Sequence, residues 1–181
     1  SRNMLDRGGE TWKGISRNNW PKWKGWELID QARESGGRNF PACLRFDAEL
    51  EDLTRLFYCE KFWKPLNIEQ IKSDISLEIF DIAVNMGSKT AGRMFQQALN
   101  LLSYLVAFPG FPLKEDGRIG NTTLQAWQAY EATHKLATRT EASNTVVMLA
   151  VLRGLKFCRY KEIIENAPTQ KAFIYGWVQR T

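Results

Sequence analysis

Carboxylates, a hydroxyl group and glycines occur close together at the start of the chain. Asp6 and Glu10 flank the pair Gly8-Gly9, and Thr11 follows Glu10 directly. Glycine has no Cβ atom, so this backbone can take positive φ and a substrate can approach it closely. A carboxylate on such a turn can orient a water molecule or stabilise positive charge in a transition state. The same residue types also form ordinary surface turns and helix caps, so spacing alone leaves a structural role open.

A second polar pair lies on a stretch with helical periodicity, residues 68–86. Asp81 and Asn85 are four positions apart, which places them on one helical face, one turn from each other. Polar side chains on so apolar a helix need partners if they are buried. A structural hydrogen bond and a place at the floor of an active site are both consistent with this spacing.

Helical periodicity also predicts the other elements that must position these residues. We expect helices over residues 26–33, 42–61, 68–86, 91–107, 122–134 and 143–159, and a last helix that begins at Pro168. Asn121 has the residue type of an N-cap for the helix after it. Strong period-two alternation is missing, so at most a small β-hairpin near Gly8-Gly9 is expected. These patterns predict a mainly α fold.

Composition is that of a globular protein with a modest positive charge. The 181 residues are 44% hydrophobic and 25% charged, with a formal net charge of +5. Such a charge favours nucleic acid, anionic lipid and bacterial cell wall alike. Tryptophans are dense near the N-terminus, at positions 12, 20, 23 and 26. Packing on the core and a flat face for a sugar ring are both open for them.

The three cysteines do not suggest a metal site or a disulfide framework. Cys43, Cys59 and Cys158 are widely spaced, and the chain has one histidine. We expect each cysteine to be a small buried residue. No signal peptide or apolar run of membrane-spanning length is visible in the sequence.

Four blocks of sequence resemble one known family. Residues Asp6 to Ile15 are similar to the Asp-x-Gly-Gly-x-Thr-x-x-Gly-Ile block of the lysozyme-like N-acetylmuramidases of glycoside hydrolase family 108. These enzymes occur as phage and prophage endolysins, some of them described as secretion activators. Three later blocks follow in the family's order: Phe80 to Gly87, Asp116 to Leu124 and Tyr175 to Arg180. The block at Asp116 resembles the family's predicted peptidoglycan-binding part, and the whole resemblance covers nearly the entire chain.

The resemblance implies a hydrolase that cleaves the β-1,4 bond between N-acetylmuramic acid and N-acetylglucosamine in peptidoglycan. It assigns the general acid to a Glu upstream of Asp6, which would precede residue 1 of this chain. Asp6 is then expected to stabilise the transition state or to orient water, and Thr11 to position that water. The spacing from that Glu to Asp6 and Thr11 is also similar to the phage lysozyme pattern, which suggests an inverting arrangement. Neither a metal nor an organic cofactor is implied.

The resemblance also implies residues that contact the substrate. Residues 62–66 are similar to the family's Tyr-Trp-x-Pro-Leu element, which places Trp63 beside the cleft. Asp81 and Asn85 are expected at its floor. Glu10 is the nearby glutamate, and we expect it to contact substrate rather than to act as the acid.

The expected architecture is one lysozyme-like domain. Residues 1–87 would form the catalytic part, truncated at its start, and residues 88–181 a helical peptidoglycan-binding-like part packed in the same globule. The expected partner is bacterial peptidoglycan, with no nucleic acid and no stable membrane insertion. A protein made in the cytoplasm would then need a holin or lysis to reach the periplasm and cell wall.

Two alternatives to the enzyme remain. One is a catalytically inactive or truncated peptidoglycan-binding module that keeps the saccharide cleft without the acid. The other is a helical nucleic-acid-binding domain, suggested by charge and aromatic content alone, since the sequence contains no recognition motif.

Overall fold

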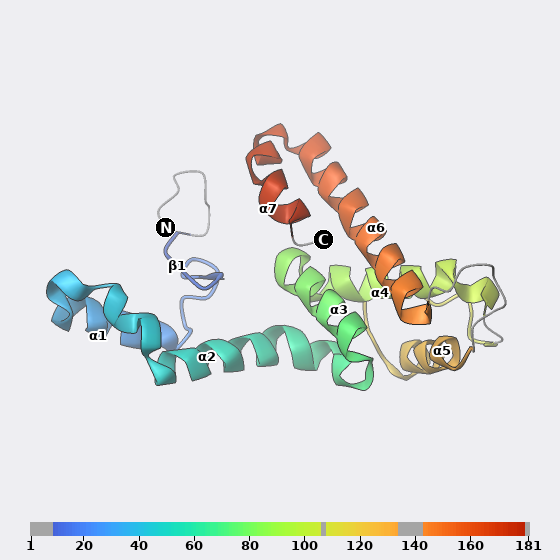
Figure 1. Cartoon of the computed structure of the whole chain (residues 1–181), viewed down its shortest axis with the longest axis horizontal. Coiled ribbons are helices and arrows are strands. Elements are labelled where there is room, and N and C mark those ends of the chain that lie inside the picture. The colour runs from blue at the N-terminus through green and yellow to red at the C-terminus, as the bar shows by residue number, and fades with distance from the viewer. Residues whose placement is uncertain (1–8, 106–107, 134–142, 180–181) are drawn as a thin grey trace. The chain divides into compact units, whose positions relative to one another are not determined.

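The computed structural model describes residues 9–105, 108–133 and 143–179. These residues form seven α-helices, short 3₁₀ and π turns, and one two-stranded antiparallel sheet (Figure 1). The helices are α1 (Gly25–Ser35), α2 (Ala48–Tyr58), α3 (Ser73–Met86), α4 (Ser88–Leu101), α5 (Asn121–Ala132), α6 (Asn144–Asn166) and α7 (Ile174–Val178), and the strands are β1 (Thr11–Trp12) and β2 (Ile15–Ser16). The predicted mainly α class with a small N-terminal hairpin is confirmed. The chain divides into two compact units, Ser1–Lys61 and Phe62–Thr181.

The hairpin of the first unit turns at Lys13 and Gly14, a few residues after the glycine pair. Their φ angles are 43° and 88°, and two-residue hairpin loops with the right twist need positive φ at both central positions. The hydroxyl of Tyr58 donates to the Lys13 carbonyl at 2.6 Å. The indole Nε1 of Trp12 donates to Oγ1 of Thr54 at 3.2 Å. These two bonds hold the hairpin against α2.

Asp47 divides the helix that we predicted over residues 42–61. Ala42–Phe46 forms a 3₁₀ turn, and Asp47 has extended backbone before α2 begins. Its carboxylate accepts a hydrogen bond from the backbone N–H of Leu50 at 2.9 Å, which is an N-cap. The continuous helix was therefore wrong, because helical spacing persists across a capping residue that does not itself continue the helix.

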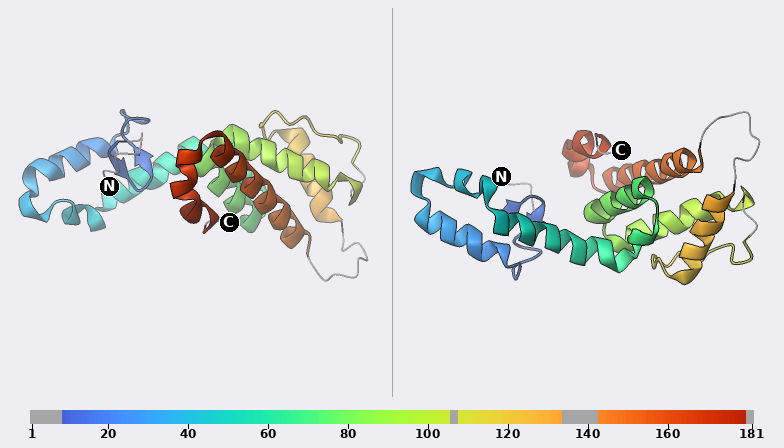
Figure 2. Two further views of the ribbon diagram at one scale, coloured as in Figure 1. Left: turned by 90° about the horizontal axis from the view of Figure 1, so that it is seen from above. Right: turned by 60° about the horizontal axis from the view of Figure 1, so that its bottom comes forward.

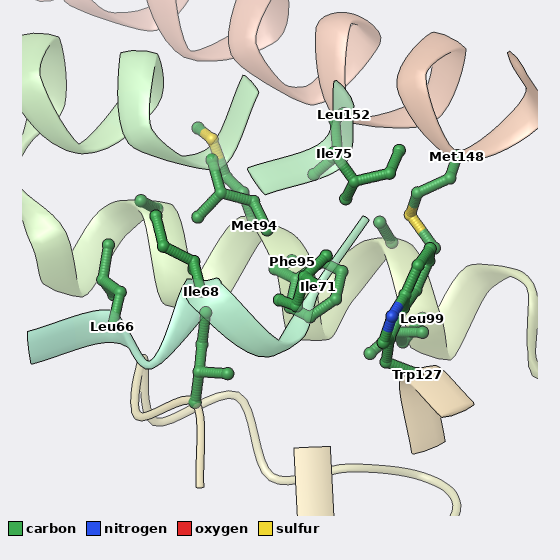
Figure 3. Packing of buried hydrophobic residues seen from close by; sticks show 14 of the residues in the cluster. Leu66, Ile68, Ile71, Ile75, Met94, Phe95, Leu99, Trp127, Met148 and Leu152 are labelled. Carbon is green, nitrogen blue, oxygen red and sulfur yellow. The ribbon is translucent and has the colours of Figure 1, made fainter. Parts of the chain in front are cut away.

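The core of the second unit lies among α3, α4, α5 and α6. Ile75 and Ile79 of α3 and Phe95 of α4 have no exposed surface. Figure 3 shows side chains from residues 66–71, α3, α4, α5 and α6 meeting in this cluster. The long helix α6 contacts both α3 and α4. The helix that carries Asp81 and Asn85 is thus fixed by the C-terminal half of the chain.

Three helix starts differ from the sequence prediction. Ile71 is extended, so the predicted 68–86 helix is a 3₁₀ turn followed by α3. The fourth helix starts three residues early, at Ser88. Asn121 is the first residue of α5, and Gly120 occupies the cap position without a side-chain bond, so the predicted Asn121 cap is wrong. The predicted end at residue 107 is also wrong, because α4 ends at Leu101 and Ser103–Leu105 forms a separate 3₁₀ turn. The predicted end of the fifth helix at residue 134 lies outside the described residues, and α5 ends at Ala132.

After α6 the chain turns back on itself. Residues Pro168–Phe173 form a 3₁₀ turn, and α7 then lies along the end of α6 (Figure 2). The rings of Tyr160 and Trp177 stack there, with centroids 5.1 Å apart. This contact anchors the Gly-Trp block near the end of the chain.

The expectation of buried cysteines is wrong at two of three positions. Cys43 and Cys158 are exposed and Cys59 is partly buried, all three as free thiols. Cys43 lies in the exposed 3₁₀ turn before α2, and Cys158 on a solvent-facing side of α6.

Among the described helices, none is both long and apolar enough to cross a membrane. Within the same residues, no group of three or more His, Cys, Asp or Glu side chains is placed to hold a metal ion.

Candidate active site

Thr11 stands at the first position of β1. Its half-buried hydroxyl donates to the carbonyl of Gly9 at 3.2 Å. A hydroxyl oxygen that donates its proton keeps its lone pairs for another donor. Thr11 is thus able to accept a hydrogen bond from a water molecule. Asp6, the other predicted catalytic residue, lies outside the described residues.

Gly9 has the conformation that the sequence predicted for the glycine pair. Its φ is 67°, and a Cβ atom there would lie 2.8 Å from Nδ2 of Asn18. The backbone angle strains any residue that has a Cβ atom, and such an atom would also displace the Asn18 side chain. Gly9 thus constrains the backbone that leads into Glu10 and Thr11.

Glu10 belongs to an ion cluster that fastens the hairpin to α1. Its carboxylate forms an ion pair with Arg17, with Oε2 2.8 Å from Nε, and also pairs with Arg33. Asp30 of α1 accepts from both guanidinium nitrogens of Arg17, at 2.8 and 2.9 Å, and pairs with Arg33 as well. The hydrogen bond from Arg17 is the main cause that lowers the pKa of Asp30. A structural role of Glu10 is thus visible, and its contact with substrate stays a prediction.

The tryptophans of the first unit divide into two roles. Trp26 is buried, at 3% exposure, and its Nε1 donates to the Trp20 carbonyl at 2.8 Å. Trp20 and Trp23 instead line a mostly apolar cavity of about 440 Å³, together with Leu56 and Phe57 of α2. A cavity with two indole walls suits the apolar face of a sugar ring.

Trp63 lies at the start of the second unit, half-buried. Its ring meets the ring of Phe80 edge-on, with centroids 5.6 Å apart and planes at 63°. Phe80 directly precedes Asp81 on α3. Trp63 is therefore packed against the helix that carries the predicted polar pair.

Asp81 and Asn85 are joined as their spacing predicted. Asn85 Nδ2 donates to Asp81 Oδ1 at 3.0 Å and to the Asp81 carbonyl at 2.8 Å. The other carboxylate oxygen, Oδ2, accepts from Nζ of Lys156 at 2.8 Å. The Asp81 side chain remains 34% exposed. Asn85 and Lys156 thus hold the carboxylate in place, and part of the side chain remains in contact with solvent.

Lys156 is the functional candidate that sequence reasoning missed. Its side chain is 0% exposed, and its Nζ also donates to Oε1 of Glu78 at 2.8 Å. Burial alone would lower the pKa of this ammonium group, but the hydrogen bonds to Asp81 and Glu78 outweigh it and the pKa is raised. The available signal was a lysine within the apolar run of α6. Its partners could not be deduced, because Asp81 lies 75 positions away in the sequence.

Comparison with known families accounts for both halves of the chain. Residues 1–87 match the family model of glycosyl hydrolase 108, and residues 90–181 match that of the predicted peptidoglycan domain. Residues 1–87 belong to glycosyl hydrolase family 108, and residues 90–181 form a predicted peptidoglycan domain. This family 108 hydrolase has no match among curated proteins. The resemblance found in the sequence is confirmed.

The two matches define the chemistry at a coarse level. A glycoside hydrolase that carries a peptidoglycan domain is a peptidoglycan-degrading glycosidase. Of its predicted site residues, Glu10 and Thr11 belong to the first compact unit, and Trp63, Asp81 and Asn85 to the second. The match to glycosyl hydrolase 108 ends at Gly87, between α3 and α4, so it extends into the second unit.

Proposed function

We propose that this hydrolase is an N-acetylmuramidase, which cleaves the β-1,4 bond between N-acetylmuramic acid and N-acetylglucosamine. The observation that carries the proposal is the pairing of a glycosyl hydrolase 108 match with a peptidoglycan domain match in one chain. Glycosyl hydrolases cleave glycosidic bonds, and the second match names peptidoglycan, the polymer that contains this bond.

The reaction needs a protonated carboxylic acid at the leaving oxygen and a second group on the opposite face of the sugar. We assign the second role to Asp6, whose carboxylate stabilises the oxocarbenium-like transition state or orients the attacking water. We assign the acid role to the glutamate that the family's pattern has upstream of this aspartate. Thr11 positions the water, which its half-buried hydroxyl supports through its unused acceptor capacity. This division of labour is that of an inverting glycosidase.

Substrate binding is assigned to side chains with sugar-compatible chemistry. The Asp81 side chain, anchored by Lys156 and Asn85, is 34% exposed, and its carboxylate oxygens can accept further hydrogen bonds from sugar hydroxyls. Trp63 offers a half-buried aromatic ring beside α3. Glu10 holds the hairpin and stands next to Thr11, so it is the first unit's candidate for a polar substrate contact.

The biological role that fits this activity is that of an endolysin. The protein is made in the cytoplasm, and a holin or lysis releases it to the periplasm and wall. A secretion activator that opens the wall locally would use the same reaction. The two roles differ in the gene's context and not in the chemistry.

The test is mass spectrometry of products released from purified Gram-negative sacculi by the full-length gene product. We expect muropeptides with reducing N-acetylmuramic acid ends. Asp6→Asn should lower the rate of release by at least about 100-fold, the usual scale of acid–base groups. The matched control is Asp52→Asn, which alters a 70% exposed carboxylate on α2 and should leave the rate unchanged.

Two results would contradict the muramidase. Reducing N-acetylglucosamine ends would show that the other glycosidic bond is cleaved. Folded protein that sediments with sacculi and releases nothing would be a peptidoglycan-binding module without activity.

A further inference from the structure

A polar hollow opens on the second unit, and neither Asp6 nor Thr11 is among the residues that line it. Its volume is about 770 Å³. One wall is the turn from Pro65 to Asn67, another is the start of α4, and the third is the loop at residues 114–120. This loop contains the Asp116 block that the sequence marked for wall binding, which the proposed reaction does not use.

The loop is rigidly built onto α4. Gln96, at 2% exposure, accepts from the Gly117 N–H at 2.8 Å and donates to the Arg118 carbonyl at 3.0 Å. A Cβ atom on Gly92 would lie 2.1 Å from the Gly117 carbonyl oxygen, so the two backbones touch. Asn100 fixes the start of the loop by bonding both the N–H and the carbonyl of Leu113. The hollow is therefore formed before any ligand arrives.

The lining of the hollow carries an excess of positive charge. Lys89, Lys114 and Arg118 line it and are exposed, and none of their side chains forms an ion pair with another described residue. Asp116 is the one carboxylate in the lining. It is committed to Gln96 Nε2 at 3.0 Å and to the Arg118 N–H at 2.9 Å.

The neighbouring acid forms no ion pair with these three cations among the described residues. Glu115 is not part of the lining, and its two carboxylate oxygens accept from Gln97 and Asn100 of α4 at 3.0 and 3.1 Å. Three cations against one committed carboxylate leave a concave surface that attracts anions. Lysine supplies mobile point charges, and arginine can bind a carboxylate with two parallel hydrogen bonds.

We propose that this hollow binds the carboxylates of the acidic peptide stems of peptidoglycan. The inference rests on peptidoglycan as the partner and deepens the proposed function. Sugar hydroxyls are neutral, so the negative charge that these cations can recognise lies on the stem peptides. The catalytic half then acts on the glycan while the hollow holds the peptide.

The test is calorimetric binding of the full chain to the free tetrapeptide L-Ala-γ-D-Glu-diaminopimelate-D-Ala and to its fully amidated form. We expect amidation to weaken binding by about tenfold or more, or about 1.4 kcal/mol. Lys89→Gln with Lys114→Gln should weaken binding of the acidic peptide to a similar extent. Lys161→Gln with Lys171→Gln removes the same charge from exposed positions outside the hollow and should leave the affinity within about twofold.

Three outcomes would overturn the proposal. Equal weakening by both double variants would show diffuse attraction to net charge. Equal affinity for the amidated peptide would remove the carboxylates from recognition. Tighter binding of glycerol phosphate than of the peptide would assign the hollow to phosphate-bearing wall polymers. Because the free tetrapeptide contains no glycosidic bond, these results are independent of the muramidase, which product release from sacculi tests separately.

Discussion

Lys156 joins the carboxylates of Glu78 and Asp81 in the second unit. Lys156→Met would leave the carboxylate of Glu78, at 8% exposure, and that of Asp81 without their shared ammonium. Removing one partner of a buried ion pair typically costs about 3–5 kcal/mol. We expect a loss of this size in the free energy of unfolding, measured by urea denaturation near neutral pH. Lys161→Met, at an exposed site on the same helix, should change it by less than about 0.5 kcal/mol.

The difference in the free energy of unfolding between the wild type and Lys156→Met should depend on pH in a defined direction. The pKa of Lys156 is raised above its ordinary value of 10.5 by its carboxylate partners. Its contribution is therefore fully present below pH 10.5 and is lost as the pH rises through the folded-state pKa. The gap between the wild type and Lys156→Met should narrow above pH 10.5. A gap that stays constant there would contradict the assigned ion pairs.

Tyr130 should also make the stability of the folded state depend on pH in the alkaline range. Burial, with a smaller effect of Tyr104, raises its pKa from 10.0 to about 12. The folded state thus favours the protonated phenol, and stability falls as the pH rises from 10 towards 12. Tyr130→Phe should show a shallower loss of stability over this range, and should remove one late-titrating group from the tyrosinate absorbance curve. A Tyr130 that titrates near pH 10 in the folded protein would refute this.

Single residues show where sequence reasoning works and where it ends. The bond from Asn85 to Asp81 follows from four-residue spacing, which is local information. The positive φ at Gly9 is a conformation that its residue type permits, although Gly36 and Gly120 show that the type does not fix it. The bond from Lys156 to Asp81 depends on how α6 packs against α3, and helical periodicity does not encode which helices become neighbours.

At the scale of elements, substitution of Asp47 can measure how much the N-cap of α2 stabilises the first unit. Asp47→Ala removes the acceptor of the Leu50 N–H and should lower the free energy of unfolding of the first unit by about 1 kcal/mol. Asp47→Asn retains a capping oxygen and should retain most of that stability. Tryptophan fluorescence during urea denaturation would measure both. Equal losses in the two variants would show that charge near the helix start, and not the cap, matters at this position.

Most helices could be placed from periodicity, but their ends could not. The predicted helices over 42–61 and 68–86 were interrupted where Asp47 and Ile71 take extended backbone. Asn121 has a capping side chain, yet Gly120 occupies the cap position. Periodicity reports which face becomes buried, and helix ends depend on local backbone geometry that several residue types can satisfy.

At the scale of the whole molecule, the compact units and the family matches have different borders. The second unit begins at Phe62, whereas the glycosyl hydrolase 108 match continues to Gly87 and so includes α3. Ile75, Ile79 and Ile82 of that helix have no exposed surface and pack in the same cluster as Phe95. The shared globule that we predicted for residues 1–87 and 88–181 stays a prediction, but α3 and the C-terminal helices already form one core.

This core predicts how the chain can be divided. A fragment of residues 62–181 keeps the whole cluster and should fold, with a cooperative thermal transition. A fragment of residues 88–181 loses α3, and burial of a single isoleucine contributes about 1.5–3 kcal/mol. Loss of three from α3, together with Leu66 and Ile68, is comparable to the whole stability of a typical domain, about 5–15 kcal/mol.

The shorter fragment should therefore be largely unfolded by circular dichroism and show no cooperative transition. Adding a synthetic peptide of residues 62–87 in excess should restore part of the helical signal, because the missing apolar face would be supplied from outside the fragment. A scrambled peptide of the same composition is the matched control. If residues 88–181 folded alone with a sharp transition, α3 would be an accessory to an independent domain, and Lys156 would be stable there without Asp81 or Glu78.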